Sequence, residues 1–126
     1  MGSRTILCID DNAAALHVRK LVLESAGYSV IAASSGEEAL RAFNSGRAVH
    51  LVLSDQFLPG ETGAQVTAKM KRLKPDIPVV ILSGALLEPE CIEHADLFLT
   101  KTGTPSELLQ AIGALLGAAE DHANYA

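Results

Sequence analysis

The sequence has few cysteines, no excess of positive charge and no long apolar run, and each shortage excludes a class of protein. Two cysteines are too few for a disulfide framework, and Cys8 lies inside an apolar segment far from Cys91, so both are predicted to be reduced thiols. Fifteen acidic residues against ten lysines and arginines give a net charge of −5, which argues against direct nucleic-acid binding. No apolar stretch approaches the roughly 20 residues that span a bilayer, and no secretory signal pattern is present. We therefore expect a cytoplasmic protein without a membrane partner.

The length of 126 residues is that of one domain with one good core. We predict a single domain over residues 1–126. Residues 1–3 have the composition of an expression remnant and receive no function. Residues 119–126 are expected to form a frayed tail or the start of a linker.

Short apolar runs alternate along the chain with segments of helical periodicity. The runs predict strands over residues 5–9, 28–32, 49–53, 79–82 and 96–100. Capping residues, glycines and prolines delimit helices over residues 13–26, from Ser34 or Ser35 to Gly46, over 62–73 and from about 105 to 116. Strands that alternate with helices imply right-handed crossovers. This predicts an α/β fold with a doubly wound, five-stranded parallel sheet covered by helices on both faces.

Polar side chains with complementary chemistry follow four of the five predicted strands. Asp10 and Asp11 follow the first strand, Asp55 the third, Ser83 the fourth and Lys101 the fifth. In an open parallel sheet, ligands bind outside the carboxyl ends of the strands. We therefore expect three carboxylates, a hydroxyl and an ammonium to converge at one edge of the sheet.

This set of groups suits phosphoryl transfer to a carboxylate. Three neighbouring carboxylates stay ionised only if a cation compensates them, and oxygen ligands suit Mg²⁺. A carboxylate beside Mg²⁺ can attack phosphorus and form an acyl phosphate, while a hydroxyl and a lysine bind the transferred oxygens. Taken singly, Asp10 and Asp11 would be a helix N-cap pair and Asp55 a loop carboxylate. Their joint occurrence with Ser83 and Lys101 favours Asp55 as a phosphoacceptor.

The same residues give the chain a resemblance to the receiver domains of response regulators, over essentially its whole length. Asp10 and Asp11 match the acidic pair after the first strand, and Asp55 with Pro59 and Gly63 matches the phosphoacceptor segment. Further along, the chain matches the hydroxyl residue, the switch aromatic and the lysine of that family, at Ser83, Phe98 and Lys101. The resemblance implies the CheY-like, flavodoxin-like strand order 2-1-3-4-5.

The resemblance also implies roles for individual residues. Asp11, Asp55 and the backbone carbonyl of Phe57 would hold Mg²⁺, with Asp10 helping partly through water. A sensor histidine kinase or a histidine phosphotransfer protein would donate the phosphoryl group to Asp55. The only catalysis expected is self-catalysed phosphotransfer and autodephosphorylation, so the protein is not an enzyme in the ordinary sense.

A switch would follow phosphorylation. The resemblance implies that Ser83 moves toward the phosphoryl group and that Phe98 turns inward, which changes the surface that an unknown downstream protein reads. Phe98 is otherwise an ordinary core aromatic. The sequence does not identify the kinase, the downstream partner, the pathway, the oligomeric state or the lifetime of the phosphoryl group, nor whether the domain stands alone.

The chain departs from the family pattern in three places. Thr102 follows Lys101 where the family has a cis proline, and a non-proline cis bond costs roughly 2.5–4 kcal/mol, so a trans bond and a rebuilt loop are predicted. The span from Ser83 to Lys101 is shorter than is usual in the family by roughly one helical turn, which predicts a shortened or missing fourth helix. Phe57 and Ala85 cannot orient water, so slow autodephosphorylation is a hypothesis. Alternatively, Phe57 packs against its own loop.

Three alternatives are considered, two of which come from other classes of protein. A flavodoxin-like electron carrier needs a phosphate-binding loop after the first strand, and the pair Asp10 and Asp11 would repel a phosphate. A hydrolase of the haloacid dehalogenase type needs a second aspartate where Asn12 stands. The remaining alternative is a degenerate receiver that acts as a phosphorylation-independent interaction module, which Thr102 and the short fourth-helix region favour.

Overall fold

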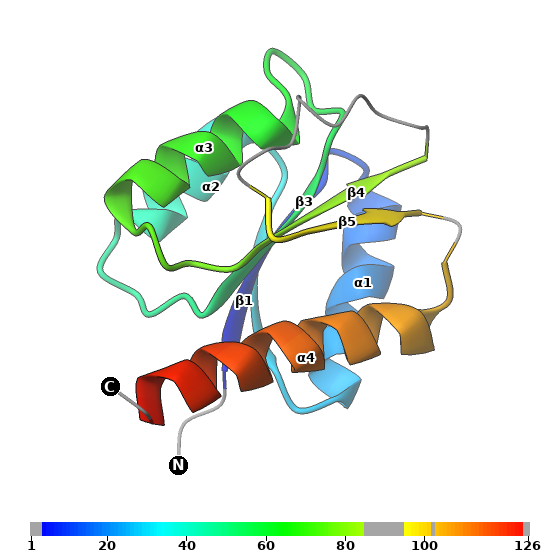
Figure 1. The fold of residues 1–126 in the computed structure, drawn as a ribbon. Coiled ribbons are helices and arrows are strands. Elements are labelled where there is room, and N and C mark those ends of the chain that lie inside the picture. The colour runs from blue at the N-terminus through cyan, green and yellow to red at the C-terminus, as the bar shows by residue number, and fades with distance from the viewer. Residues whose placement is uncertain (1–3, 85–94, 102, 125–126) are drawn as a thin grey trace.

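The computed structural model describes residues 4–84, 95–101 and 103–124, which form three layers with a parallel sheet in the middle (Figure 1). The strands are β1 Thr5–Ile9, β2 Ser29–Ala33, β3 Leu51–Asp55, β4 Val79–Ser83 and β5 Leu97–Thr100. Their order is β2-β1-β3-β4-β5, and every neighbouring pair is parallel. The predicted fold class and strand order are confirmed.

Within the described residues, four helices cover the sheet. They are α1 Ala13–Ser25, α2 Gly36–Phe43, α3 Gly63–Leu73 and α4 Pro105–Asn124. Helices α2 and α3 lie on one face, and α1 and α4 lie on the other (Figure 1). Helix α4 ends well beyond the predicted position near residue 116, because residues 118–124 contain no proline or glycine and include good helix formers such as alanine. Helix α4 therefore includes residues 119–124, and the fraying of this segment stays a prediction.

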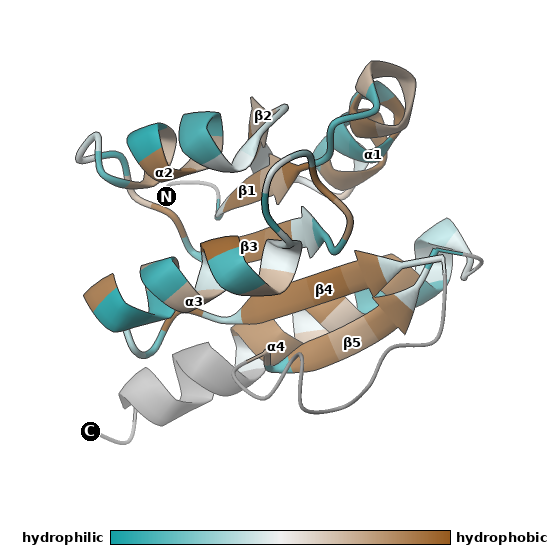
Figure 2. Ribbon diagram, turned by 90° about the horizontal axis from the view of Figure 1, so that it is seen from above, coloured by the Kyte–Doolittle hydropathy of each residue, from teal (hydrophilic) through white to brown (hydrophobic). Residues whose placement is uncertain are grey.

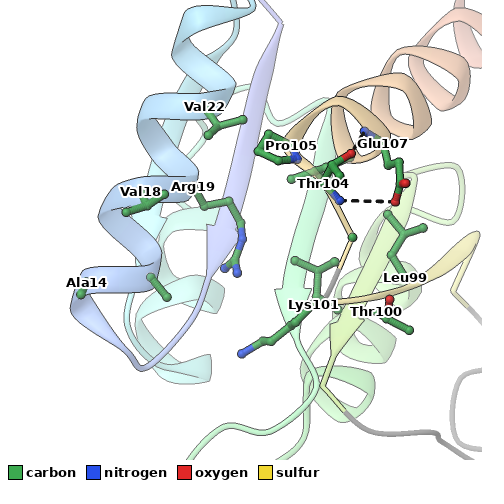
Figure 3. A pocket seen from close by; sticks show the side chains of 14 residues that line it. Ala14, Val18, Arg19, Val22, Leu99, Thr100, Lys101, Thr104, Pro105 and Glu107 are labelled. Atoms are coloured by element: carbon green, nitrogen blue, oxygen red, sulfur yellow. Dashed lines mark hydrogen bonds between the residues drawn. The ribbon is translucent and has the colours of Figure 1, made fainter.

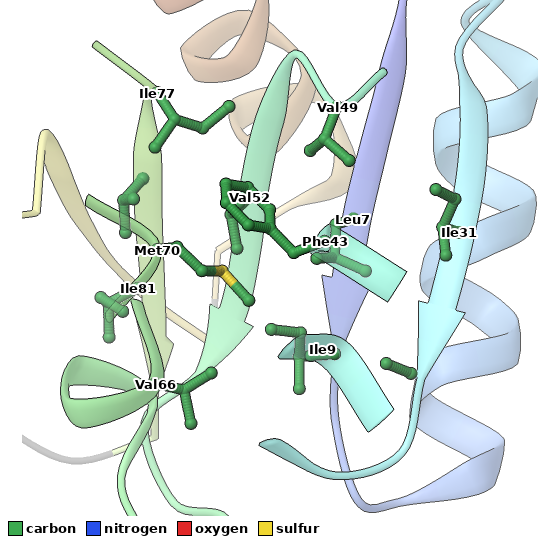
Figure 4. Close-up of a cluster of buried hydrophobic side chains, with 13 residues drawn as sticks. Leu7, Ile9, Ile31, Phe43, Val49, Val52, Val66, Met70, Ile77 and Ile81 are labelled. Carbon is green, nitrogen blue, oxygen red and sulfur yellow. The ribbon is translucent and has the colours of Figure 1, made fainter. Parts of the chain in front are cut away.

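Alternate residues of the strands fill two separate hydrophobic cores. In β1, Leu7 and Ile9 point toward α2 and α3, whereas Ile6 and Cys8 point toward α1 and α4 (Figure 4 shows the first core). All four side chains are fully buried. Strands β3, β4 and β5 are likewise mostly hydrophobic, while α2 and α3 mix hydrophobic and hydrophilic positions (Figure 2). This two-sided burial explains why the strands are continuous apolar runs in the sequence.

Strand β3 runs two residues later than predicted, from Leu51 to Asp55. The prediction ended this strand at Leu53 because two polar residues follow. Ser54 and Asp55 nevertheless continue the backbone pairing with β4, and Ser54 also pairs with β1. Backbone groups must be satisfied in the interior whatever side chain the residue carries. Asp55 is thus the last residue of a buried central strand and not a loop residue.

Two predictions fall outside the described residues. The shortened or missing fourth helix concerns residues 85–94, and the trans bond with its rebuilt loop concerns Thr102. Cys8 is a free cysteine, and burial raises the pKa of its thiol to about 11, whereas Cys91 also lies outside the described residues. Among the helices of the described residues, none is long and apolar enough to cross a membrane.

Candidate functional site

Three carboxylates meet at the carboxyl ends of β1 and β3. Asp10, Asp11 and Asp55 each offer an oxygen, and these oxygens lie within 4.8 Å of one another. Asp10 and Asp55 are buried, whereas Asp11 is exposed. The predicted acidic cluster therefore exists, and its exposed member opens it to solvent.

Asp10 is held from two sides. The backbone N–H of Asn12 donates to its Oδ1 atom at 2.9 Å, and Nη1 of Arg19 donates to its Oδ2 atom at the same distance. Burial alone would raise the pKa of Asp10, but the hydrogen bond from Asn12, the Arg19 guanidinium and the positive charge of Lys101 together lower it. Asp10 is therefore ionised at neutral pH. It does not cap α1, because the side chain of Asn12 takes that role by accepting from the backbone N–H of Ala15 at 2.9 Å.

Lys101 connects the acidic cluster with the end of β5. Its Nζ atom donates to Oδ2 of Asp55 at 2.6 Å and lies 3.7 Å from Oδ2 of Asp10. The backbone N–H of Phe57 donates to the other oxygen of Asp55 at 3.3 Å. Asp55 thus has one oxygen at a side-chain ammonium and the other at a main-chain donor.

Ser83 and Phe98 lie on the neighbouring strands β4 and β5. Ser83 is fully buried at the end of β4, and its carbonyl accepts from the backbone N–H of Lys101 at 2.8 Å, which fixes where the lysine leaves the sheet. Phe98 is partly buried in β5 and packs against the core under α2 and α3. The structure places Ser83 one residue past the position that pairs with Asp55, in agreement with the predicted convergence.

The loop after β3 is braced against α3. Gln56 is buried, its carbonyl accepts from the N–H of Gly63 at 2.8 Å, and its side-chain oxygen accepts from the N–H of Ala64 at 3.0 Å. Gly63 is required here, because an added Cβ atom would collide with the carbonyl oxygen of Asp55 and lie 2.8 Å from Oγ of Ser54. The backbone that carries Asp55 is therefore fixed by close contact with the first turn of α3.

Sequence reasoning missed two of these residues. No role is predicted for Arg19 from the sequence, although this residue stands between Leu16 and Leu23 on the buried stripe of α1. A lone cation in an apolar stripe is a signal that it meets a buried carboxylate. Gln56 gave no comparable signal, because its amide serves the backbone of α3 and not the cluster.

A cavity adjoins the site on the face covered by α1 and α4. Its volume is about 440 Å³, and apolar side chains such as Val18, Val22 and Leu99 line most of it. Arg19 and Lys101 extend into the same region from α1 and from the end of β5 (Figure 3). The two cations of the site therefore border a space into which side chains can move.

The donor set fits Mg²⁺. This ion favours oxygen ligands, commonly uses one or two carboxylates and keeps several waters. Two buried carboxylates with a third that is open to solvent meet these needs. Asp10, Asp11 and Asp55 would hold the ion. For the backbone carbonyl of Phe57, the role as a ligand stays a prediction.

Residues 6–113 match the family of the response regulator receiver domain. The chain is 34% identical over 122 residues to the phosphate regulon transcriptional regulatory protein PhoB of Pseudomonas aeruginosa, covering 92% of this chain and 53% of that protein. It spans 25% of the length of two other matching regulators.

Solved receiver domains have the same fold. A CheY-like receiver domain protein of Methanospirillum hungatei superposes with a TM-score of 0.89 at 28% identity, covering 96% of this chain and 99% of that one. The response regulator TrrA of Thermotoga maritima, solved in complex with Mg(2+)-BeF, gives a TM-score of 0.83 at 29% identity, covering 89% and 98%. These similarities extend over nearly the whole of both chains.

Proposed function

Because the chain belongs to the response regulator receiver domain family, we propose that it accepts a phosphoryl group on Asp55 in a Mg²⁺-dependent reaction. The donor is a phosphohistidine of a sensor histidine kinase or of a histidine phosphotransfer protein. The observation that carries the proposal is the contact of Asp55 with Lys101 inside the acidic cluster. One carboxylate oxygen is thereby oriented beside a cation and within reach of two further carboxylates.

The residues of the chain divide the chemistry among them. An oxygen of Asp55 attacks phosphorus, an O–P bond forms, and the P–N bond of the phosphohistidine breaks with its electron pair passing to the imidazole, which takes up a proton. The Lys101 ammonium neutralises charge on the phosphoryl oxygens. Mg²⁺, held by Asp10, Asp11 and Asp55, would supply further neutralisation of the transferred group.

The acceptor is then its own catalyst and not an enzyme for an external substrate. The phosphoryl group adds strongly charged acceptor oxygens at the end of β3, and the buried residue Ser83 ends the neighbouring strand β4. Movement of Ser83 and Phe98 toward the site would change the outer surface of β4 and β5, and a downstream protein would read that change.

Intact-mass measurement after incubation with Mg²⁺ and a small acyl-phosphate donor tests the proposal. We expect one phosphoryl adduct that requires Mg²⁺, is absent from Asp55→Asn and persists in Asp76→Asn, which changes an exposed surface aspartate. An adduct that survives Asp55→Asn would place the acceptor elsewhere.

The second candidate is a receiver that binds partners without phosphorylation. Thr102 at the position of the usual proline favours it. Folded protein that binds Mg²⁺ but forms no adduct, either with the small donor or with a phosphorylated histidine phosphotransfer protein, would support this candidate over the first.

A further inference from the structure

Arg19 is the one residue of α1 that the described structure places in an ion pair with the acidic cluster. Its side chain is only 13% exposed, and its partner Asp10 is fully buried. The guanidinium therefore lies inside the protein surface, where its charge is only weakly screened by water and salt. From this arrangement we propose that Arg19 is a built-in competitor of Mg²⁺ that sets how tightly the site binds the metal. The inference rests on the Mg²⁺ site of the proposed function and adds a determinant of its affinity.

The first reason is occupancy of the ligand atoms. Both oxygens of Asp10 already accept hydrogen bonds, Oδ1 from Asn12 and Oδ2 from Arg19. The Asn12 donor is a backbone N–H and stays in place, whereas the guanidinium is carried by a flexible side chain. A metal ion that uses Oδ2 of Asp10 must therefore displace or share the bond to Arg19.

The second reason is charge. In formal charges, the three acidic side chains contribute three negative charges, and Lys101 and Arg19 offset two of them. A divalent cation thus meets a site with one net negative charge, whereas the same site without Arg19 would present two. Because the nearby charges lie within a few ångströms in a partly buried site, the loss of one cation strengthens the attraction for Mg²⁺ substantially.

The third reason is that the Arg19 side chain borders a cavity into which its guanidinium can move. It lines the cavity between α1 and α4, and Figure 3 shows its side chain extending along this space. The guanidinium can leave Asp10 without displacing a packed helix. Arg19 accordingly acts as a positioning residue: it holds the Asp10 carboxylate by an ion pair when no metal is bound, and it gives way when Mg²⁺ binds.

Calorimetric titration with MgCl₂ tests the proposal directly, together with thermal melting in the absence and presence of MgCl₂. The test variant is Arg19→Gln, which keeps an N–H donor for Asp10 but removes the charge. We expect Mg²⁺ to bind it at least about fivefold more tightly than the wild type. We also expect it to melt at a lower temperature without Mg²⁺ and to gain more thermal stability from Mg²⁺.

Two further variants separate charge from structure. Arg19→Lys retains the charge and should bind Mg²⁺ within about twofold of the wild type. Arg41→Gln removes an equal charge from the exposed ion pair with Glu37 on α2 and should leave Mg²⁺ affinity unchanged. If Arg19→Gln does not fold, Arg19→Met takes its place, since an unbranched apolar chain suits the stripe between Leu16 and Leu23.

The outcomes distinguish the inference from the function beneath it. Equal Mg²⁺ affinity of the wild type and of the neutral Arg19 variant would overturn the inference and leave the proposed function intact. Tightening of the same size in Arg41→Gln would also overturn it, because net charge alone would then explain the effect. Absence of Mg²⁺ binding in all variants would overturn the inference together with the metal requirement of the proposed function.

Discussion

The Nζ atom of Lys101 lies 2.6 Å from Oδ2 of Asp55, although 46 residues separate the two in the sequence. The contact joins the ends of β3 and β5, which are not neighbours in the sheet. It is possible because the backbone N–H of Lys101 bonds to the carbonyl of Ser83 on the intervening strand. The backbone pairing of the sheet therefore brings Asp55 and Lys101 together.

Replacement of Lys101 by methionine should slow phosphorylation of Asp55 at least about tenfold, because the ammonium that neutralises the phosphoryl oxygens is lost. The protein should also lose roughly 1 kcal/mol of unfolding free energy, a modest amount because Lys101 is about one-third exposed. Adduct formation followed by mass, with urea unfolding alongside, measures both effects.

Lys71→Met is the matched control for Lys101→Met, since Lys71 forms an ion pair of 2.8 Å with Asp96, before the start of β5 and away from the acidic cluster. This variant should phosphorylate at the wild-type rate. Equal slowing in both variants would remove Lys101 from the chemistry.

Gly63→Ala should destabilise the protein by about 1–3 kcal/mol. The added methyl group would collide with the carbonyl of Asp55 and press on Ser54, so the strand that carries the acceptor must shift. Gly113→Ala, on helix α4, provides the control. The nearest atom to its new methyl group is the hydroxyl oxygen of Tyr28, at 4.0 Å. That change should be neutral or stabilise by up to about 1 kcal/mol, since alanine favours helix. Urea unfolding measures the stability of both variants. Equal stability of Gly63→Ala and Gly113→Ala would show that the backbone around Asp55 can shift at little cost to make room for the methyl group.

The sheet and the acidic edge could be predicted because their signals are local. Continuous apolar runs identify strands that are covered on both faces, and the carboxyl ends of parallel strands must share an edge. Asp10, Asp11, Asp55 and Lys101 therefore converge as predicted. Ser83 lies on the neighbouring strand, at the position that the convergence requires.

The remaining features depend on contacts that no local pattern contains. Strand β3 continues through Ser54 and Asp55 because both neighbouring strands offer backbone partners, a fact that polarity alone cannot show. Arg19 contacts Asp10 only because the chain folds back after β1, so that the first turns of α1 pack beside the end of that strand. Gln56 braces α3 by hydrogen bonds to backbone groups, and no residue pattern identifies such a partner in advance.

Phe57→Asn should speed the decay of the phosphorylated protein several-fold. Phe57 stands two positions after Asp55 and its backbone N–H is bonded to the Asp55 carboxylate, while its side chain is not packed into the core, because Phe57 is 55% exposed. An amide at this position can orient a water molecule that the ring excludes, which is how a positioned polar group assists hydrolysis. Adduct mass followed over time measures the lifetime.

Phe57→Leu controls for the shape of the Phe57 side chain and should decay as slowly as the wild type. Rapid decay of the wild-type adduct, unchanged in Phe57→Asn, would favour the view that the ring only packs against its own loop, where Phe57 pairs with Thr62.

Arg19→Gln should make the protein more sensitive to acid. Burial would raise the pKa of Asp10, and the hydrogen bonds and charges around it lower that pKa below its ordinary value of 3.8. A carboxyl whose pKa is lower in the folded state stabilises the protein at pH values above 3.8, and this stabilisation is lost as the pH falls through the folded pKa. Loss of the guanidinium raises the folded pKa, so the stabilisation is smaller at neutral pH and disappears at a higher pH.

Urea unfolding between pH 3 and pH 7, without divalent ions, should thus show a smaller rise in stability with pH for Arg19→Gln than for the wild type. The exposed pair of Arg41 with Glu37 supplies the comparison, because Arg41→Gln should leave the pH profile nearly parallel to that of the wild type. Parallel profiles for Arg19→Gln as well would mean that Asn12 and Lys101 suffice to keep Asp10 ionised. The role of Arg19 at the acidic cluster would then be reduced to packing on α1.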